Sequence, residues 1–247
     1  VYKEICVNLP MTPRDEEFRQ QWLTPFLDLK HKGKLSAPRG LKILELEDYQ
    51  LEINPLNRFC AFEERKLPLK YLVGELCWYL DADPHDFERI EHYSKFWKKL
   101  RNEKAPFYNS NYGYAFFKEG QFWHVIDTLK VDKDSRQASV IINKAEVMMG
   151  NSKDKICTYA VNFRIRQDQL NMSVCMRSND YFLGTPIDVF QFLSIYDLIF
   201  WHLKLTYPDL ELGTYVHKVD SFHIYEDKFP IMEAIVANNT IHDSTFK

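Results

Sequence analysis

One helical segment, from Pro186 to Leu205, constrains the fold more than any other part of the sequence. Apolar residues lie on nearly every side of that helix, so it has to be buried among other elements. The apolar stretch within it is interrupted by Gln191, Asp197, His202 and Lys204. Since a membrane span tolerates few charges, the segment predicts a buried helix at the centre of a core and not a transmembrane helix.

The segments around this helix predict a large sheet. Two long strands are expected at 156–166 and 170–177, joined by a tight turn, and residues 41–46 alternate apolar and polar side chains as a half-buried strand does. Further strands are expected at 138–143 and 215–225, and helices at 67–80, 87–100, 120–131 and 228–238. Because strands and helices are mixed without strict alternation, we expect an α+β fold, with a large mixed β-sheet packed on helices around the central buried helix.

Length and composition favour a single domain over residues 1–247. Of the 247 residues, 45% are hydrophobic, which is enough for a full-sized core, and no linker or internal repeat divides the chain. The net charge of -3 and the sequence pI of about 6.3 argue against a nucleic-acid partner. Only 8 residues are Gly, which argues against a Gly-rich phosphate loop.

The five cysteines are widely spread along the chain and include no Cys-x-x-Cys pair. This pattern argues against a structural zinc site and against a disulfide framework. We therefore expect reduced thiols, no bound metal and a cytoplasmic location. The first ten residues, VYKEICVNLP, lack the apolar run of a signal peptide, and we expect no membrane partner.

Two features of the sequence carry reactive groups. Cys157 lies in one of the two long strands, and Arg177 and Asp180 lie where the other strand ends. A hairpin would bring these groups together, and a neighbouring guanidinium favours the thiolate over the free-thiol pKa of about 8.5. The alternative is a buried structural cysteine. Glu75 lies in an apolar helix, and a buried carboxylate there needs a partner and often marks a functional site. The alternative interpretation is that Glu75 lies on the surface of the helix.

Several segments resemble the thymidylate synthase family. The stretch CMRSNDYFLGTPIDVFQF, residues 175–192, resembles the family's nucleotide-binding signature. Cys157 precedes Arg177 by 20 residues, as the family's nucleophile precedes its signature Arg. Three more segments resemble family motifs: GELCWYL at 74–80, DSRQ at 134–137 and DSFHIY at 220–225. The resemblance covers about residues 36–235 and implies the family's fold, a pyrimidine nucleoside monophosphate substrate and a folate cosubstrate.

The resemblance implies a role for each matching residue. Cys157 would be the nucleophile that adds to carbon 6 of a pyrimidine, with Tyr112 close to it. Glu75 would relay protons through water around the base. Asp180 would bond to the base and to the folate ring, and Trp78 would contact the folate. Arg39, Arg177 and Ser178 would bind the 5′-phosphate of the substrate. Arg136 would bind the phosphate held by the other subunit of a homodimer. His223 and Tyr225 would bind the sugar 3′-hydroxyl.

The most informative departure from the family is Asp188, where thymidylate synthases carry the Asn that reads uracil. An Asn amide can donate to carbonyl oxygen 4 of uracil and accept from its ring N–H, whereas a carboxylate cannot donate. The exocyclic amine of cytosine can donate to an Asp, and a proton shared between the carboxyl and ring nitrogen 3 completes the pair. Asp188 therefore predicts a cytosine base, and the alternative is an acid that caps the long helix.

Other departures point in the same direction. Thr158 stands where the family has His after the nucleophile, Gln137 replaces the second Arg of its Ser-Arg-Arg turn, and Ser94 replaces a Trp that contacts folate. Together with Asp188, the segments 109–113 (NSNYG) and 176–180 (MRSND) resemble the deoxycytidylate hydroxymethylases of bacteriophages, a branch of this family. A phage origin would place the protein in the host cytoplasm.

The expected reaction converts dCMP and 5,10-methylenetetrahydrofolate to 5-hydroxymethyl-dCMP and tetrahydrofolate through a covalent adduct of Cys157. Four alternatives stay open: a thymidylate synthase with an atypical Asp, a hydroxymethylase of dUMP or CMP, a dCMP C5-methylase, and a catalytically silent nucleotide- or RNA-binding relative. The intact set of Cys157, Glu75, Arg177 and Asp180 argues against the silent relative.

Overall fold

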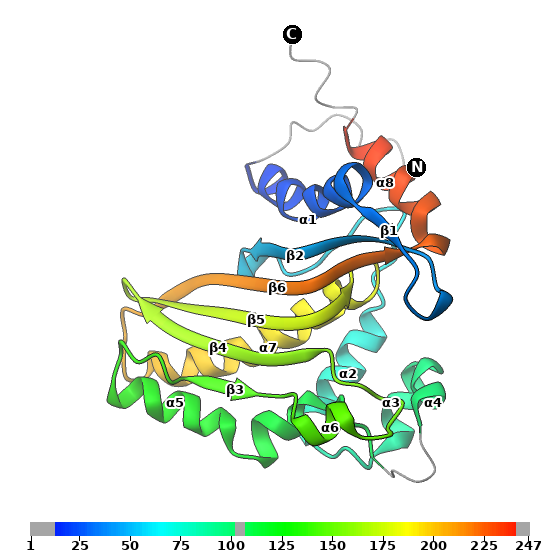
Figure 1. Cartoon of the computed structure of the whole chain (residues 1–247). Coiled ribbons are helices and arrows are strands. Elements are labelled where there is room, and N and C mark those ends of the chain that lie inside the picture. Colours follow the sequence, from blue (N-terminus) through cyan, green and yellow to red (C-terminus); the bar gives the residue numbers. More distant parts are fainter. Residues whose placement is uncertain (1–12, 102–106, 241–247) are drawn as a thin grey trace, which may run out of the picture.

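A six-stranded sheet crosses the centre of the structure (Figure 1), a computed structural model that describes residues 13–101 and 107–240. The strands are β1 (Lys34–Ser36), β2 (Ile43–Ile53), β3 (Ser139–Ile141), β4 (Thr158–Arg166), β5 (Gln169–Asp180) and β6 (Glu211–Tyr225). Their order across the sheet is β1-β2-β6-β5-β4-β3, and β5 and β6 pair in parallel while the other neighbours are antiparallel. The sheet is therefore mixed, which confirms the predicted α+β class.

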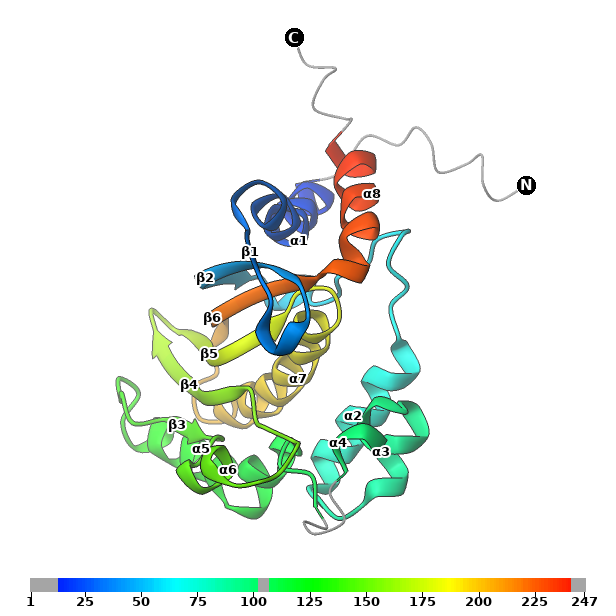
Figure 2. The ribbon, with the colours of Figure 1, turned by 45° about the vertical axis from the view of Figure 1, so that its right-hand side comes forward.

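Helices cover the sheet and extend beyond one end of it. They are α1 (Pro13–Lys32), α2 (Leu69–Asp81), α3 (Phe87–Tyr93), α4 (Phe96–Leu100), α5 (Gln121–Val131), α6 (Ala145–Met149), α7 (Gly184–Lys204) and α8 (Phe229–Thr240). α7 runs along one face of the sheet in contact with β5 and β6, and α5 packs beside it (Figure 2). α1 and α8 pack on each other, and α1 also packs on β2, near the edge of the sheet away from β3. α2 contacts both α3 and α7, and α3 contacts α4.

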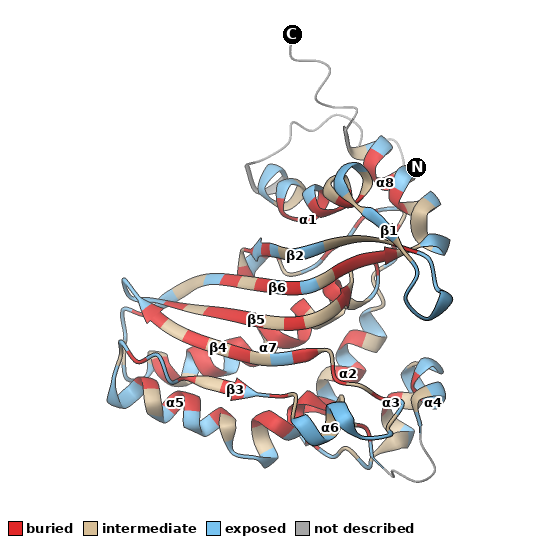
Figure 3. Ribbon diagram, in the orientation of Figure 1, coloured by how far each residue is buried: buried red, intermediate tan, exposed pale blue. Residues whose placement is uncertain are grey.

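The prediction of a central buried helix is confirmed in α7. Its buried residues, which include Val189, Ile195 and Leu203, cover most of the helix circumference, and the remaining face carries the exposed Leu198 and Trp201. Buried positions recur along β5 and β6, the strands that α7 contacts, between intermediate and exposed ones (Figure 3). No helix in the described part of the chain is both long enough and apolar enough to cross a membrane.

The predicted tight turn joins β4 to β5. Gln167 and Asp168 form it with φ of 52° and 58°, the left-handed values that a type I′ turn requires at its two central residues. This turn has the same twist as the strands, so pairing runs from Arg166 and Gln169 to Thr158 and Met176, with one register shift between Ala160 and Thr158. The start of β4 therefore lies beside the end of β5, which matters for the site described below.

Some elements differ from the prediction. The single helix expected at 87–100 is divided into α3 and α4, because Ser94 adopts an extended backbone and its hydroxyl accepts from the Phe96 N–H at 3.3 Å. β2 and β5 run past their predicted ends to Ile53 and Asp180, because β6 supplies paired neighbours along both. The alternation at 41–46 covers only the first part of β2.

α1, β1 and α6 were not predicted. The sequence of α1 is rich in charged residues and contains Pro25, which obscures its apolar face. That face buries Trp22, Phe26 and Leu29, and the Trp22 indole Nε1 donates to the Asn57 carbonyl oxygen at 2.8 Å. Tertiary packing against β2 and α8 decides the structure of this segment.

Candidate active site

Polar groups from three strands converge at one end of the sheet. β4 begins at Thr158, directly after Cys157, and runs antiparallel to β5, so Cys157 lies beside the end of β5. The Arg177 N–H donates to the Cys157 carbonyl oxygen at 2.9 Å. β5 and β6 run parallel, and the last pair of their ladder joins Asp180 to His223. The strand topology therefore brings these four residues to the same place.

Cys157 is half-buried, and this burial raises the pKa of its thiol. The positive charges of Arg177 and Arg39 act to lower that pKa, while the negative charges of Asp188 and Asp154 add to the increase. Arg177 acts in the expected direction, toward the thiolate, but the net effect in the free protein is a raised pKa. Desolvation of the thiolate outweighs its attraction to the guanidinium.

Two arginines lie near Cys157. Arg177 donates from Nε and Nη2 to the carbonyl oxygens of residues 155–156, at 2.9 and 3.0 Å, which fixes the plane of its guanidinium. Because a guanidinium has five N–H donors, Arg177 retains donors for an anion. Arg39 lies on an exposed turn between β1 and β2, with a left-handed φ of 56°, and bonds to the Tyr225 hydroxyl.

Glu75 is a buried carboxyl with two donors. It lies in the middle of α2 with 3% of its surface exposed, which excludes the helix-surface alternative. The Tyr71 hydroxyl donates to Oε1 at 2.6 Å, and Gln191 Nε2 donates to Oε2 at 3.0 Å. Trp97 Nε1 donates to the Tyr71 oxygen at 3.0 Å, so the Tyr71 proton is directed at Glu75. Burial raises the pKa of Glu75 from 4.5 to about 8, although both donors act to lower it.

Asp188 and Asp180 are neighbouring acids with different partners. Asn179 Nδ2 donates to Asp188 Oδ2 at 2.6 Å. Burial raises the pKa of Asp188 from 3.8 to about 7, and the charge of Asp180 adds to that increase. Asp180 accepts from the backbone N–H groups of Phe182 and Leu183, each at 3.1 Å, and burial raises its pKa as well. Asp188 lies inside α7 and bonds to a side chain, so it does not act as the helix cap.

Tyr112 lies close to both Cys157 and Asp188. Burial raises the pKa of its hydroxyl, and the negative charges of these two groups add to the increase. The next residue, Gly113, lies against the backbone of Tyr79 in α2. A Cβ at Gly113 would be 1.8 Å from the Tyr79 carbonyl oxygen, so only Gly allows this approach. The close contact holds Tyr112 over the site.

The ends of β5 and β6 supply three further side chains. Ser178 is half-buried and pairs with Ser221 across the two strands. The His223 ring is buried and meets the Tyr225 ring edge-on, with centroids 5.1 Å apart. His223 is close enough to Asp180 for its positive form to lower the pKa of that acid.

Arg136 lies away from this group in its own chain. It is exposed in the turn between α5 and β3. Since Ser139 pairs with Asn162 in the middle of β4, residues before Ser139 lie toward the Arg166 end of that strand. Cys157 precedes the opposite end of β4, so Arg136 does not reach it within one chain.

Trp78 lies beneath the site. Its exposed fraction is 0%, and its ring packs edge-on against Trp97 and Tyr108, with centroids 5.2 and 6.0 Å apart. In this arrangement the side chain supports α2 from inside and presents no surface to a ligand. The aromatic group that Trp78 completes also holds Trp97, the donor to Tyr71.

The sequence interpretation missed the partners of the two carboxyls. Tyr71 lies four residues before Glu75, a spacing that places both side chains on one side of a helix and could have identified the pair. Gln191 was considered only as an interruption of the apolar run. Asn179 lies in the signature segment, but nothing in the sequence indicates that it bonds to Asp188.

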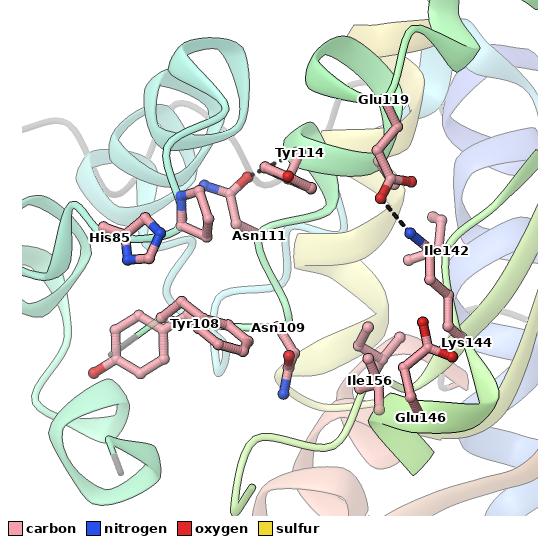
Figure 4. A pocket seen from close by; sticks show the side chains of 14 residues that line it. His85, Tyr108, Asn109, Asn111, Tyr114, Glu119, Ile142, Lys144, Glu146 and Ile156 are labelled. Atoms are coloured by element: carbon pink, nitrogen blue, oxygen red, sulfur yellow. Dashed lines mark hydrogen bonds and ion pairs between the residues drawn. The ribbon is translucent and has the colours of Figure 1, made fainter. Parts of the chain in front are cut away.

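A cavity of about 490 Å³ opens next to the converging groups (Figure 4). Its wall includes Tyr108, Asn109 and Asn111 on one side and Ile142, Lys144 and Ile156 on the other. The ion pair between Lys144 and Glu119 lies on this wall. The cavity borders the site through Ile156 and Asn111, the residues before Cys157 and Tyr112, and none of the predicted site residues lines it.

The acidic side chains at the site bond to N–H and O–H donors. Over residues 13–101 and 107–240, no three His, Cys, Asp or Glu side chains are grouped so that they could hold a metal ion. The chemistry that this geometry supports is therefore that of a thiol, three carboxyls with raised pKa values and a pair of arginines.

Known proteins resemble this chain over most of its length. A family model described as thymidylate synthase matches residues 20–247. A deoxyuridylate hydroxymethyltransferase of Bacillus phage SP01 is 27% identical over 219 residues, which cover 80% of this chain and 54% of that protein. The chain thus spans about half the length of this relative. Deoxycytidylate 5-hydroxymethyltransferases of Enterobacteria phages T6 and T4 are 26% and 25% identical over 216 residues, covering 84% of this chain and 85% of each relative.

The matched region contains every residue that converges at the end of the sheet. The predicted resemblance is thereby confirmed over a longer stretch than the motifs alone covered. The chain belongs to the thymidylate synthase family, whose enzymes bind a nucleoside monophosphate and use methylenetetrahydrofolate as cosubstrate.

Proposed function

We propose that the chain is a one-carbon transferase that converts dCMP and 5,10-methylenetetrahydrofolate to 5-hydroxymethyl-dCMP and tetrahydrofolate. The observation that carries the choice of base is Asp188, a carboxyl whose pKa is raised to about 7 at the position from which the family reads the base. The choice of a hydroxymethyl product is supported by the phage relatives, which are hydroxymethyltransferases.

The pKa of Asp188 matters because cytosine presents both a donor and an acceptor. Its exocyclic amine donates and its ring nitrogen 3 accepts. A protonated carboxyl offers one O–H and one acceptor oxygen, and a pKa of about 7 makes this form available at neutral pH. A base with the opposite pattern would leave a buried polar pair unmatched, which can cost on the order of 10⁴-fold in specificity.

Cys157 is the proposed nucleophile. Its sulfur bonds to carbon 6 of the pyrimidine, and the electrons of the 5,6 double bond make carbon 5 a nucleophile. When bound, methylenetetrahydrofolate supplies the one-carbon unit that carbon 5 takes up. Loss of the proton on carbon 5 breaks the bond between the one-carbon unit and the folate nitrogen, which releases tetrahydrofolate and leaves an exocyclic methylene on carbon 5. Water adds to that methylene carbon, and departure of the Cys157 sulfur from carbon 6 restores the 5,6 double bond. Arg177, beside Cys157, stabilises the thiolate that starts and ends this cycle.

Glu75 is the proposed proton relay. Its pKa of about 8 lies close to neutral pH, where a group can both take up and release protons. Tyr71 and Gln191 hold its two oxygens in place, and the charge of Asp188 reaches it. Glu75 therefore has the orientation and the pKa that proton transfers around a bound base require.

The 5′-phosphate is assigned to Arg39, Arg177 and Ser178, since a phosphate dianion is best held by several charge-assisted hydrogen bonds. Arg177 retains N–H donors beside Cys157. Arg39, on its exposed turn, is also close enough to Cys157 for its charge to act on the thiol. The sugar 3′-hydroxyl is assigned to His223 and Tyr225.

Arg136 is assigned to the phosphate site of a second copy of the chain, so we propose a homodimer. The support is its exposure and its place at the opposite end of β4 from Cys157. A residue that cannot reach the site of its own chain can reach that of a symmetric partner.

The described residues fit a folate. Its rings need an apolar surface and its ring N–H groups need an acceptor. Leu183 has 50% of its surface exposed, and the Asp180 carboxyl receives its backbone N–H, so the two lie side by side. Asp180 is the proposed acceptor, and Trp78 acts indirectly by supporting α2.

Product analysis tests this function. The protein is incubated with methylenetetrahydrofolate and, separately, dCMP, dUMP or CMP, and the products are identified by mass. We expect dCMP to gain one CH₂O unit fastest. Gain of CH₂ alone would identify a methylase, and conversion of dUMP in preference to dCMP would overturn the assignment of the base. Binding without any product would favour a silent relative.

A second candidate is hydroxymethylation of dUMP. The relative from Bacillus phage SP01, a deoxyuridylate hydroxymethyltransferase at 27% identity, favours it. The ionised form of Asp188 argues against it, because a carboxylate facing uracil would meet carbonyl oxygen 4 with like charge. The same product analysis separates the two candidates.

A further inference from the structure

A chain of four side chains leads from the core to Asp188. The Tyr215 hydroxyl lies 2.6 Å from His217 Nδ1, His217 Nε2 lies 3.3 Å from Asn179 Oδ1, and Asn179 Nδ2 lies 2.6 Å from Asp188 Oδ2. Tyr215 and His217 each have 0% of their surface exposed, and Asn179 is buried. Tyr215 and His217 come from β6, Asn179 from β5 and Asp188 from α7, so the chain joins three elements at the site.

The protons in this chain have one favoured arrangement. Burial lowers the pKa of His217 from 6.5 to about 3, so its ring is neutral and carries a single N–H. If Tyr215 donates to Nδ1, that N–H is on Nε2 and donates to Asn179 Oδ1. The Thr185 hydroxyl donates to the same oxygen. The Asn179 amide is then oriented with its NH₂ group toward Asp188, and every contact has one donor and one acceptor.

The reversed arrangement is less favourable. It would require a proton on the Asp188 oxygen that faces Asn179. It would also leave the Tyr215 hydroxyl proton without an acceptor among the described residues, because His217 is its one bonded neighbour there. A buried donor left without a partner costs about 1–3 kcal/mol.

The favoured arrangement fixes the roles of the two Asp188 oxygens. Oδ2 receives the Asn179 amide, and a carbonyl-type oxygen accepts better than a hydroxyl oxygen, so a proton on Asp188 belongs on Oδ1. A carboxyl whose proton could move between its oxygens could match the donor and acceptor order of either pyrimidine. A carboxyl whose proton is confined to one oxygen matches only one order.

We infer that Asn179, oriented by His217 and Tyr215, is a specificity-determining positioning residue that confines the Asp188 proton to the oxygen facing ring nitrogen 3 of cytosine. This inference rests on the proposed function for the identity of the base. The confinement itself rests only on the hydrogen bonds of the free protein. Asn179 acts through Asp188 and not by contact with the base.

The experiment compares three variants with the wild type. Asn179→Leu removes the amide with little change in volume, and Tyr215→Phe removes the hydroxyl at the far end of the chain. Tyr196→Phe is the matched control, since the Tyr196 hydroxyl is equally buried but bonds to the Leu170 carbonyl oxygen at 2.6 Å, outside this chain. Circular dichroism establishes that each variant is folded.

The first measurement is the ratio of kcat/KM for dCMP to kcat/KM for dUMP. We expect the ratio to fall at least tenfold in Asn179→Leu, about threefold in Tyr215→Phe and not at all in Tyr196→Phe. A folded Asn179→Leu with the wild-type ratio would overturn the inference. The wild-type ratio alone tests the proposed function, so a wild type that prefers dUMP would refute that function without deciding the role of Asn179.

The second measurement needs no activity. The Asn179 donor lowers the pKa of Asp188, so carboxyl-labelled protein should show the Asp188 pKa in Asn179→Leu at least about half a unit above the wild-type value. Asp188→Asn identifies the signal by removing it. An unchanged Asp188 pKa would show that Asn179 does not control the proton, whatever the substrate of the enzyme.

Discussion

Asp188 and Glu75 are two acids in one site whose pKa values are both raised, to about 7 and about 8. Each has a donor from a neighbouring side chain that limits the increase, Asn179 for Asp188 and Tyr71 for Glu75. Pairs of titratable groups with different environments are typical of sites that divide acid and base roles. At the residue scale, the chemistry depends on which of these acids holds a proton.

Replacing Asp188 with Asn should move the preference from dCMP toward dUMP, because an amide can donate to carbonyl oxygen 4 of uracil. We expect the ratio of the two kcat/KM values to change at least about a hundredfold, roughly 2.7 kcal/mol. Release of tritium from carbon 5 of each labelled nucleotide measures it. Asp197→Asn, the same change further along α7, is the control and should leave the ratio as it is. An unchanged ratio in Asp188→Asn would mean that this residue does not read the base.

Replacing Tyr71 with Phe should shift the pH dependence of kcat. The Tyr71 hydroxyl lowers the pKa of Glu75, so its loss should raise that pKa further above 8. We expect the part of the pH profile that reflects the ionisation of Glu75 to move about half a unit to one unit toward higher pH. Glu75→Gln identifies this part by abolishing it. A profile in Tyr71→Phe that overlays the wild type would contradict the role of this hydroxyl.

At the scale of elements, the sequence predicted those whose own pattern decides their structure. The apolar segment that becomes α7 and the hairpin of β4 and β5 are of this kind. α1 could not be predicted, because its structure depends on packing against β2 and α8. The candidate site follows the same division: Cys157 and Arg177 were placed by their spacing, whereas the bond from Asn179 to Asp188 depends on how α7 docks on β5.

The β4–β5 turn gives a test at this scale. Gln167 and Asp168 both hold left-handed φ values, which cost more for these residues than for Asn and Gly. The double change Gln167→Asn with Asp168→Gly should raise the free energy of unfolding by about 0.5–1 kcal/mol, measured in urea. The surroundings of Cys157 should not change, because the turn lies at the opposite end of β4.

The control for this test is Lys133→Ala. Asp168 forms an exposed ion pair with Lys133, and such pairs contribute little to stability. We expect Lys133→Ala to change the urea midpoint only slightly. A double variant that unfolds at the wild-type midpoint would indicate that the turn is not strained.

At the scale of the whole molecule, the buried titratable groups predict how stability depends on pH. The folded-state pKa values of Glu75 and Asp188 are raised to about 8 and about 7, so their contribution is fully present below their ordinary values of 4.5 and 3.8 and is lost progressively as the pH rises from there to about 8 and 7. The folded-state pKa of His217 is lowered to about 3, so its contribution is present above 6.5 and is lost as the pH falls. Between about pH 5 and 6.5 the two acids lose more stability than the one histidine gains, and from pH 6.5 to 8 only the acids change, so the stability of the nucleotide-free protein should fall from pH 5 to pH 8.

Calorimetry between pH 5 and 9 checks this prediction. Glu75→Gln should reduce the loss of stability on the alkaline side by at least about 1.4 kcal/mol, the value of one pKa unit, or about 3–6 °C in Tm. A single transition would also support our proposal that residues 1–247 form one domain. If the Tm of the wild type rose steadily from pH 6 to 9, the assignment of the two raised pKa values would be wrong.

The proposed homodimer can be tested with two inactive variants. Cys157→Ala should lose turnover while it still binds nucleotide, and Arg136→Ala should lose phosphate affinity. When the two are mixed and allowed to exchange subunits, each mixed dimer should contain one complete site, which restores about a quarter of wild-type activity if subunits pair at random. Sedimentation should show the dimer. No recovery, despite exchange, would mean that Arg136 serves no partner site.

The strand topology distributes the proposed machinery unequally. The nucleophile and its arginine are fixed by the pairing of β4 with β5, and a change there alters the sheet itself. The proposed reading of the base depends on one side chain near the start of α7, Asp188, which accepts a hydrogen bond from the Asn179 amide. The codons for Asp and Asn differ by a single nucleotide, so one point mutation suffices to change the reading residue while the sheet stays intact. A fold built in this way lets its lineage explore new substrates by small genetic steps, and its relatives include enzymes named for both bases.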